Sequence, residues 1–484
     1  MFRFTQHRRL SITSIILAPS LLLFLLITTH IIPLNSRGSM VIFATPTIPN
    51  VDRSPLQLSS DPYTNSKSQH QTELEPATYS YGSTIVTAFQ AGRFIDAASS
   101  NIAWATSFDK GVTWKNGFLP GTTQFAAGPY TRVSDPSVAY DSAHKTWIIS
   151  SIASIGNGNT LASPTIIVNL STDGGISWSK PFRVVNGGST YYDKDWIVCD
   201  NSPTSMFYGH CYIEWDNDDK GGLILMSTST DGGISWGVAQ TTLDKAHGLG
   251  GQPLVQPNGT VIVPISGYAT SRMLSFTSTD GGNSWNSTIE VSKITGSVLP
   301  SAGIDAAGKV YLVWVDCQFE QGCSSKGGDV DSIRNKSSQS EDDIVMSTSV
   351  DGIHWSPVQL IPIDPLASGI DHIVPGLGVD KHTSGKTTHL ALTYYYHATN
   401  CHSNCQYYTG FVSSTDAGFH WKQTIQLAGP MSLSWLSQGR NKVGDYISTS
   451  FCNGLAFPIF SIATAPENGY LKETIYTISG GLIV

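Results

Sequence analysis

Arginine, aspartate and tyrosine stand close together in several short stretches of this chain. The clearest are "AGRFID" with Arg93 and Asp96, "YTRVSDP" with Arg132 and Asp135, and "GRNKVGDY" with Arg440, Asp445 and Tyr446. A guanidinium binds a carboxylate through two parallel hydrogen bonds, and an aspartate can transfer a proton to or from a reacting group. These stretches therefore indicate a site for an anionic ligand or, more simply, aspartates that cap backbone groups in turns.

The balance of charge narrows the kind of partner. The chain has 484 residues, a net charge of −8, and only 13% charged residues. After the first 44 residues it has seven arginines, at positions 53, 93, 132, 183, 272, 334 and 440. Because no stretch is strongly basic, we expect no nucleic-acid partner.

Residues 1–44 differ in composition from the rest. Arg3, Arg8 and Arg9 precede a run from Leu10 to Ser36 without Asp, Glu, Lys or Arg. Positive charge before a long apolar run is typical of a signal peptide or an uncleaved membrane anchor. We therefore expect an extracellular protein, either secreted or tethered to the membrane by this segment.

The seven cysteines agree with export. Six form close pairs in sequence, 199/211, 317/323 and 401/405, and Cys452 is left over. No CxxC motif or Cys/His cluster with ligand spacing is present, so a metal site is not expected. We expect two or three short-loop disulfides, for which Cys199/Cys211, Cys317/Cys323 and Cys401/Cys405 are the candidates, and one buried free thiol.

One octapeptide pattern, S-x-D-x-G-x-x-W, recurs along the chain. Its copies are "SFDKGVTW" at 107, "STDGGISW" at 171 and 229, "STDGGNSW" at 278, the shorter "SVDGIHW" at 349, and "STDAGFHW" at 414. Each follows an apolar or alternating run typical of a strand, such as "TIIVNL" or "DIVMST". Asp accepts hydrogen bonds from the following backbone, Gly allows a positive φ, and Trp covers the hairpin. The pattern therefore predicts tight turns between strands, not six catalytic sites.

These octapeptides resemble the Asp-boxes (BNR repeats) of sialidase-like β-propellers, and the resemblance runs from Tyr79 to the C-terminus. Segments such as "DKDWIVCDNSP", "DHIVPGLGVD" and "VGDYISTSF" are also similar to a subgroup of bacterial exported proteins classed with the exo-alpha-sialidases. The resemblance implies an all-β propeller of four-stranded blades with six Asp-boxes. Seven blades are favoured over six, because three further strands follow the last box and "SPLQLSS" can complete their blade. The expected domains are a leader (1–44), a linker with the closing strand (45–78) and the propeller (79–484).

The resemblance also implies roles for residues on the face opposite the boxes. In retaining sialidases three arginines hold the carboxylate of the sugar, a Tyr assisted by a Glu attacks the anomeric carbon, and an Asp supplies a proton. The matching residues by position are Arg132, Arg272 and Arg440, with Arg93 in reserve, Tyr446 or Tyr268 as nucleophile, and Asp135 or Asp96 as acid. No cofactor is implied, and Ca²⁺ near Asp329, Asp331, Asp342 and Asp343 has weak support.

The sequence departs from the family pattern in two places. The first blade opens with "ELEPATYSYG" instead of a Phe-Arg-Ile-Pro-like motif, and Glu214 in "YIEW" lies toward the end of a strand. We expect an exported, monomeric, sialidase-like glycoside hydrolase acting on terminal acidic sugars of a glycan or polysaccharide. The alternatives are a non-catalytic carbohydrate- or protein-binding propeller and an extracellular assembly scaffold.

Overall fold

The computed structural model describes residues 54–157, 160–188, 190–268, 270–294, 299–323, 341–399, 401, 405–439 and 443–484. The expected leader (1–44) lies outside these residues, as do Arg440, Asp329 and Asp331. The described residues fall within one compact unit, Val51–Val484. Among them, no helix has the length and apolar character needed to cross a membrane.

The chain folds into antiparallel sheets whose strands mostly follow one another in sequence. The first sheet contains two sets of four strands, joined only by the pairing of Ser99 with Val133. The first set is β2 (Glu73–Tyr81), β3 (Thr84–Arg93), β4 (Ser99–Ser107) and β5 (Lys115–Phe118). The second set is β6 (Arg132–Asp141), β7 (Thr146–Asn157), β8 (Thr160–Ser171) and β9 (Phe182–Asn186).

Four further sheets follow in chain order. Their strands are β10 (Tyr192–Cys199), β11 (Cys211–Asn217) and β12 (Leu223–Ser229); β13 (Gly248–Leu249), β14 (Leu254–Val255), β15 (Val261–Gly267), β16 (Arg272–Ser278) and β17 (Ile289–Lys293); β18 (Ser301–Ile304), β19 (Val310–Asp316), β20 (Asp343–Ser349) and β21 (Gln359–Leu360); and β22 (Ile370–Val379), β23 (Leu390–Ala398), β24 (Gln406–Ser414) and β25 (Ile425–Ser432). Short 3₁₀ turns are η1 (Gln124–Ala126), η2 (Asp218–Lys220) and η4 (Gly385–Thr387).

The last sheet joins the two ends of the described chain. It contains β26 (Ser448–Cys452), β27 (Leu455–Glu467), β28 (Tyr470–Ile478) and β29 (Leu482–Ile483), together with β1 (Pro55–Gln57). Leu56 of β1 pairs with Thr477 of β28. An N-terminal strand thus completes a C-terminal sheet, which leaves β28 without an open edge there.

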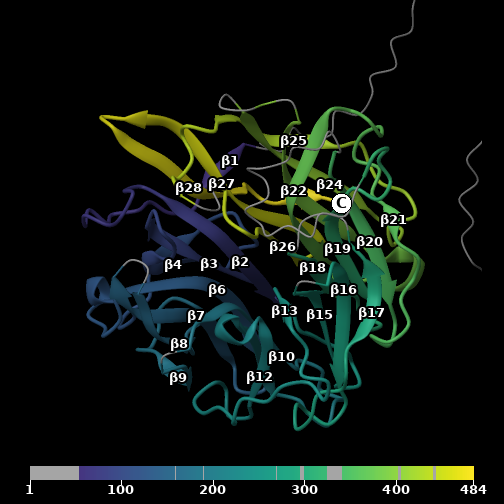
Figure 1. Ribbon diagram of the computed structural model, residues 1–484, viewed down its shortest axis with the longest axis horizontal. Coiled ribbons are helices and arrows are strands. Elements are labelled where there is room, and N and C mark those ends of the chain that lie inside the picture. Colours follow the sequence, from purple (N-terminus) through teal and green to yellow (C-terminus); the bar gives the residue numbers. More distant parts are fainter. Residues whose placement is uncertain are drawn as a thin grey trace, which may run out of the picture. The chain divides into compact units, whose positions relative to one another are not determined.

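The first strands of successive sheets pack against one another in a closed order. Contacts join β2 to β6, β6 to β10, β10 to β14, β14 to β18, β18 to β22, β22 to β26, and β26 back to β2. In Figure 1 the sheets follow one another around a common centre. The apolar side chains that fill the spaces between sheets come from neighbours in this order, as with Ile148 of β7, Ile197 of β10 and Trp215 of β11. The first strands therefore line the middle of the molecule.

The six octapeptides form turns with the same hydrogen bonds. In each, the Ser hydroxyl donates to the Asp carboxylate two residues later and accepts from the Gly N–H, as Ser171 does with Asp173 and Gly175. Gly175 has φ 89°, and a Cβ there would lie 3.0 Å from Thr106 Oγ1. The motif residues therefore hold the turns, and the hydrogen bonds of the Ser hydroxyl with Asp and Gly stay within each turn.

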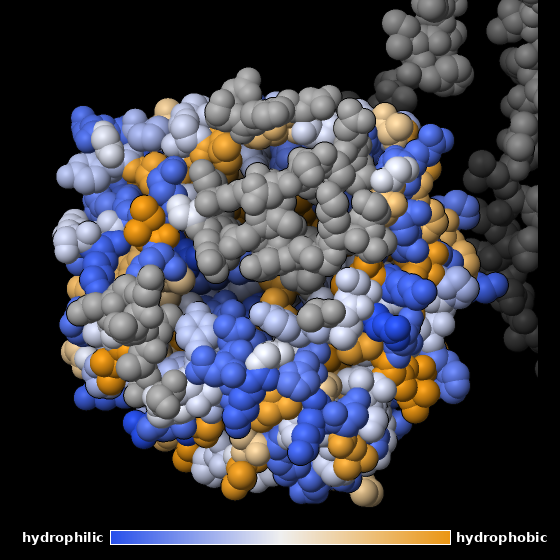
Figure 2. Space-filling view, viewed as in Figure 1, coloured by the Kyte–Doolittle hydropathy of each residue, from blue (hydrophilic) through white to orange (hydrophobic). Residues whose placement is uncertain are grey.

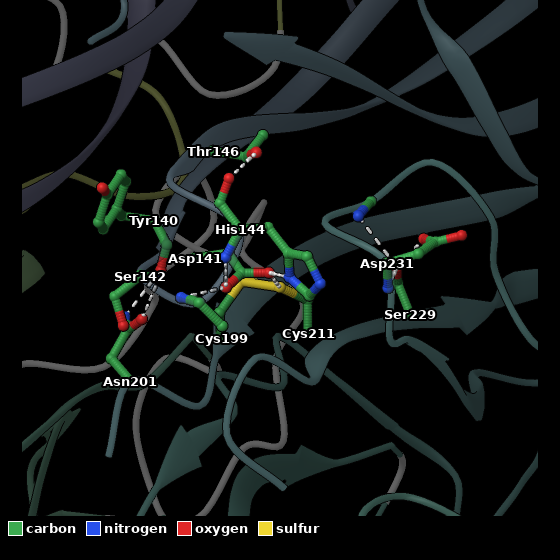
Figure 3. The surroundings of a disulfide bond; sticks show 12 residues. Tyr140, Asp141, Ser142, His144, Thr146, Cys199, Asn201, Cys211, Ser229 and Asp231 are labelled. Carbon is green, nitrogen blue, oxygen red and sulfur yellow. Dashed lines mark hydrogen bonds and ion pairs between the residues drawn. A yellow bond between two sulfur atoms is a disulfide. The ribbon is translucent and has the colours of Figure 1, made fainter. Parts of the chain in front are cut away.

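Three disulfides join the three close cysteine pairs, as the spacing predicted: Cys199–Cys211, Cys317–Cys323 and Cys401–Cys405. Cys452 is a buried free thiol. Figure 3 shows the first disulfide beside Asp141, whose carboxylate pairs with His144 Nδ1 at 2.7 Å. Disulfides are typical of proteins in oxidising compartments, so they favour an extracellular location.

Candidate functional site

Bulges bring ionisable side chains together where the first strands begin. The ladder shifts register between Leu74 and Ala77 in β2, between Ser134 and Ser137 in β6, and between Asp193 and Trp196 in β10. The bulged residues Glu75, Asp135 and Lys194 have φ values of 56°, 51° and 37°. Because a bulge changes the direction of a side chain, these three strands can place charges at one end of the ring. We call this the entry end, and the other the exit end.

Four carboxylates at the entry end, two of them buried and two half-buried, act on one another electrostatically. We call Glu75, Asp135, Asp193 and Asp445 the carboxylate cluster; they come from β2, β6, β10 and the segment before β26. The backbone N–H of Asp445 donates to Glu75 Oε1 at 3.3 Å, and Gln90 Nε2 donates to Glu75 Oε2. Side chains from distant parts of the sequence therefore meet here.

Burial and like charge raise the pKa values of Asp193, Asp445 and Glu75. Burial, reinforced by the charge of Asp135, raises the pKa of Asp193 to about 7. Burial and the charge of Glu75 raise the pKa of Asp445 well above its usual value. Burial also raises the pKa of Glu75, against the opposing charge of Arg93. Carboxyl groups that stay protonated near neutral pH can act as general acids.

Two cations accompany the cluster. Lys194 is buried, and its Nζ lies 3.7 Å from the ring centroid of Tyr446 and 4.4 Å from that of Trp196. Arg93, also buried, donates from Nη1 to Gln90 Oε1 at 3.0 Å. Four carboxyl groups thus face two positive charges among the described residues, so this end is richer in acidic than in basic groups.

Tyr446, the expected nucleophile, lies within this group. Its hydroxyl donates to the backbone oxygen of Pro136 at 3.1 Å, and its ring packs edge-on against Trp196. Burial raises the pKa of Tyr446 well above its usual value. The phenol is therefore held neutral, next to Lys194 and the carboxylate cluster.

The arginines expected to act together are placed differently from one another. Arg132 is only 1% exposed and pairs with Asp96, the alternative acid, at 3.3 Å. Arg272 lies half-exposed on β16 and pairs with Glu290 of β17. Arg93 joins the carboxylate cluster, and Arg440 lies outside the described residues. Tyr268, the alternative nucleophile, is 45% exposed beside Gly222.

Sequence reasoning missed Lys194 and Glu75, and it named Glu214 without assigning it a role. Glu214 of β11 is fully buried, and neither of its carboxylate oxygens has a hydrogen-bond partner among the described residues. A Cβ on Gly251 would lie 2.4 Å from Cδ of Glu214. A signal was present for Glu75 and Asp135, since each precedes a proline, Pro76 or Pro136, at the start of a first strand.

The exit end of the ring holds a cavity. A cavity of about 590 Å³ is lined by the later residues of the first strands and by the turns that follow them, including Tyr79, Tyr81, Asn201 and Lys381. The Tyr79 hydroxyl oxygen accepts from Lys381 Nζ at 2.8 Å and from Asn201 Nδ2 at 3.3 Å. Although burial acts in the opposite direction, the charge of Lys381 lowers the pKa of Tyr79 below its usual value. Figure 2 shows hydrophilic and hydrophobic residues interspersed over the described part of one face of the molecule.

Comparison with known proteins gives a family match over part of the chain. Residues 165–379 match the family described as a BNR repeat-like domain. This range contains four of the six octapeptides, so the resemblance to BNR-repeat proteins is confirmed there. No curated protein matches the chain.

Several solved structures are similar at low sequence identity. A Hadza microbial sialidase is 13% identical with a TM-score of 0.44, over 84% of this chain and 65% of its own; this chain thus spans about two-thirds of that protein. An α-L-arabinofuranosidase from Fusarium graminearum is 13% identical with a TM-score of 0.48, over 88% of this chain and 97% of its own. A protein of unknown function from Dyadobacter fermentans is 12% identical with a TM-score of 0.45, over 75% and 98%.

Proposed function

We propose that residues 54–484 form a seven-bladed β-propeller with six Asp-boxes. The closed order of contacts among seven first strands supports this blade count, and the repeated turn hydrogen bonds support the six boxes. The seventh blade, β26–β28 with β1, has no box. On this proposal the propeller begins with β2, at Glu73, instead of at residue 79. The leader directs export, and the exported protein is either secreted or tethered to the membrane.

We infer that this propeller is an exported glycoside hydrolase whose active site is the carboxylate cluster. The observation that carries the proposal is the convergence of four carboxyl groups, two buried and two half-buried, from three strands and the segment before β26, one with a pKa of about 7. Glycoside hydrolysis commonly needs one protonated and one ionised carboxyl group on either side of the scissile bond. Asp193 suits the proton donor, and Asp135 suits the partner carboxylate.

The charge of the site favours a neutral sugar over the acidic sugar that the family resemblance implied. An acidic sugar needs unpaired arginines, because its carboxylate must be matched on binding. Among the described residues, Arg132 pairs with Asp96 and Arg272 with Glu290, while Arg93 faces carboxylates. A second carboxylate brought into this cluster would be repelled. The half-buried Trp196 offers a ring on which a neutral sugar can stack.

The proposal is tested by assaying the full chain, with its disulfides intact, on fluorogenic neutral and acidic glycosides. We expect turnover of at least one neutral glycoside and a loss of roughly 100-fold or more in Asp193→Asn and Asp135→Asn. Glu467→Gln is the matched control, because Glu467 is an exposed carboxylate paired with Lys472. Turnover confined to an α-sialoside or another acidic glycoside would contradict the proposed substrate class.

The exit-end cavity favours a second candidate function, glycan binding without cleavage. Since Tyr79 oxygen already accepts two hydrogen bonds, its own hydrogen is directed elsewhere, and Lys381 adds a positive charge. Tyr81 adds an aromatic face to the same cavity. If the full chain cleaves no glycoside but binds oligosaccharides, and Lys381→Ala removes that binding, this second function replaces the first.

A further inference from the structure

Three side chains with metal-ligating atoms, none of them part of the carboxylate cluster, meet where the fourth and fifth sheets adjoin. Asp343 begins β20, His372 lies near the start of β22, and Asp364 lies in the segment between β21 and β22. One potential ligand atom from each lies within 4.8 Å of the others. His372 is 2% and Asp343 6% exposed, so water has little access to two of the three.

The orientation of the imidazole leaves one nitrogen facing a carboxylate. His372 Nδ1 lies 3.2 Å from the backbone oxygen of Asp342, and a carbonyl oxygen can only accept, so Nδ1 carries a hydrogen. Nε2 is then directed toward Asp364 Oδ2, 3.7 Å away, which is too long for a hydrogen bond. A cation between Nε2 and Asp364 Oδ2 would satisfy both the nitrogen lone pair and the carboxylate. The backbone contact to Nδ1 is the kind that orients a metal-binding histidine.

A second observation points to a cation independently of the histidine. Asp343 Oδ2 is buried and has no hydrogen-bond partner among the described residues, although a buried carboxylate oxygen without a partner is costly. The charges of Glu320 and Glu341 also act on Asp343. A cation bound next to Asp343 would therefore offset the negative charge of these carboxylates.

The surrounding carboxylates hold the segment that carries Asp364. Glu320, inside the loop closed by Cys317–Cys323, accepts from the backbone N–H of Ala367 at 3.0 Å. Glu341 accepts from the backbone N–H of Gly369 at 2.7 Å. Because Glu320 and Glu341 are engaged by the backbone, Asp343, Asp364 and His372 remain as ligands.

We propose that Asp343, Asp364 and His372 bind one divalent metal ion of the Zn²⁺ or Mn²⁺ class, which ties β20 and β22 to the intervening segment. An imidazole with two carboxylates suits these ions, whereas Ca²⁺ is bound almost entirely by oxygen. The site makes no use of the carboxylate cluster, so it stands whether or not the proposed hydrolase activity is found.

The test uses the full chain, with intact disulfides, freed of metal by a chelator and titrated with Zn²⁺, Mn²⁺ and Ca²⁺ by calorimetry. We expect one equivalent of Zn²⁺ or Mn²⁺ to bind and to raise the Tm. We expect binding to weaken about 10–100-fold in Asp364→Asn and His372→Asn. His382→Asn is the matched control, because the His382 side chain is 78% exposed and pairs only with Asp380 among the described residues.

Asp364→Asn keeps the experiment informative if His372→Asn fails to fold, because Asp364 is partly exposed in a connecting segment. Folding of each variant is checked by circular dichroism. The proposal is overturned if no ion binds with defined stoichiometry. It is also overturned if Ca²⁺ alone binds, or if Asp364→Asn binds Zn²⁺ and Mn²⁺ as tightly as the unmodified chain.

Discussion

At the scale of single residues, the entry end combines backbone strain with charge repulsion. Positive φ values at Glu75, Asp135 and Lys194 each cost on the order of 1–3 kcal/mol in a residue with a side chain. The carboxylate cluster adds repulsion between buried like charges. Strained residues of this kind are common at functional sites. Here the bulges direct the strained side chains toward one place.

A pH profile tests the role of Asp193. Because burial raises the pKa of Asp193 to about 7, this carboxyl group is protonated below neutral pH and ionised above it. If it donates the proton to the leaving group, kcat falls as the pH rises through about 7. We expect Asp193→Asn to remove this descending limb and to lower kcat roughly 100-fold or more. An unchanged limb in Asp193→Asn would assign the proton transfer to another group.

The sequence allowed part of this site to be predicted. Asp135, Tyr446 and Arg93 could be placed at one end of the ring because strand parity assigns loops to faces. The arginine partners could not be predicted, since Glu290 pairs with Arg272 across a strand ladder and Asp96 reaches Arg132 from the segment between β3 and β4. Pairing of this kind depends on register, which the local sequence does not determine.

At the scale of elements, the turns followed from sequence because their hydrogen bonds are local. Ser171, Asp173 and Gly175 contact one another within four residues, so the octapeptide alone specifies the turn. The bulges in β2, β6 and β10 were not predicted, because they depend on pairing with the neighbouring strand. The prolines after Glu75 and Asp135 are the only local sequence feature that marks the bulges in β2 and β6.

Glu73 tests how β2 is joined to the last sheet. It accepts from Ser59 Oγ at 3.0 Å and from the N–H of Ile475 in β28 at 3.3 Å. Burial, with the charge of Asp61, raises the pKa of Glu73 to about 8. The folded state therefore keeps a proton that the unfolded chain releases near the ordinary glutamate pKa of 4.5, so this contribution is full below pH 4.5 and is lost as the pH rises toward 8.

As the pH rises from 5 to 8, we expect the free energy of unfolding to fall less in Glu73→Gln than in the unmodified chain. The difference is about 1.4 kcal/mol for each unit by which the pKa of Glu73 differs between the folded and the unfolded chain. Denaturant unfolding at the two pH values measures this change. Asp61 remains in both proteins and cancels in the comparison. Parallel losses of stability in the two proteins would show that Glu73 is not held protonated by burial.

At the scale of the whole molecule, the closed ring of first strands has two chemically different ends. The entry end has the carboxylate cluster with Lys194, and the exit end has the cavity beside Tyr79 and Lys381. The strand order could be anticipated from the repeated motif, and pairing of β1 with β28 joins the chain ends. The chemical difference between the two ends could not be anticipated, because it depends on side chains from strands that are distant in sequence.

The most direct measurement is a crystal structure of the full chain carrying Asp193→Asn, soaked with the neutral oligosaccharide that the unmodified protein cleaves or binds best. We predict that the sugar lies at the entry end, with its glycosidic oxygen within hydrogen-bond reach of the substituted amide at position 193 and a ring stacked near Trp196. A sugar bound only in the cavity beside Tyr79 and Lys381 would contradict the account and identify a binding protein.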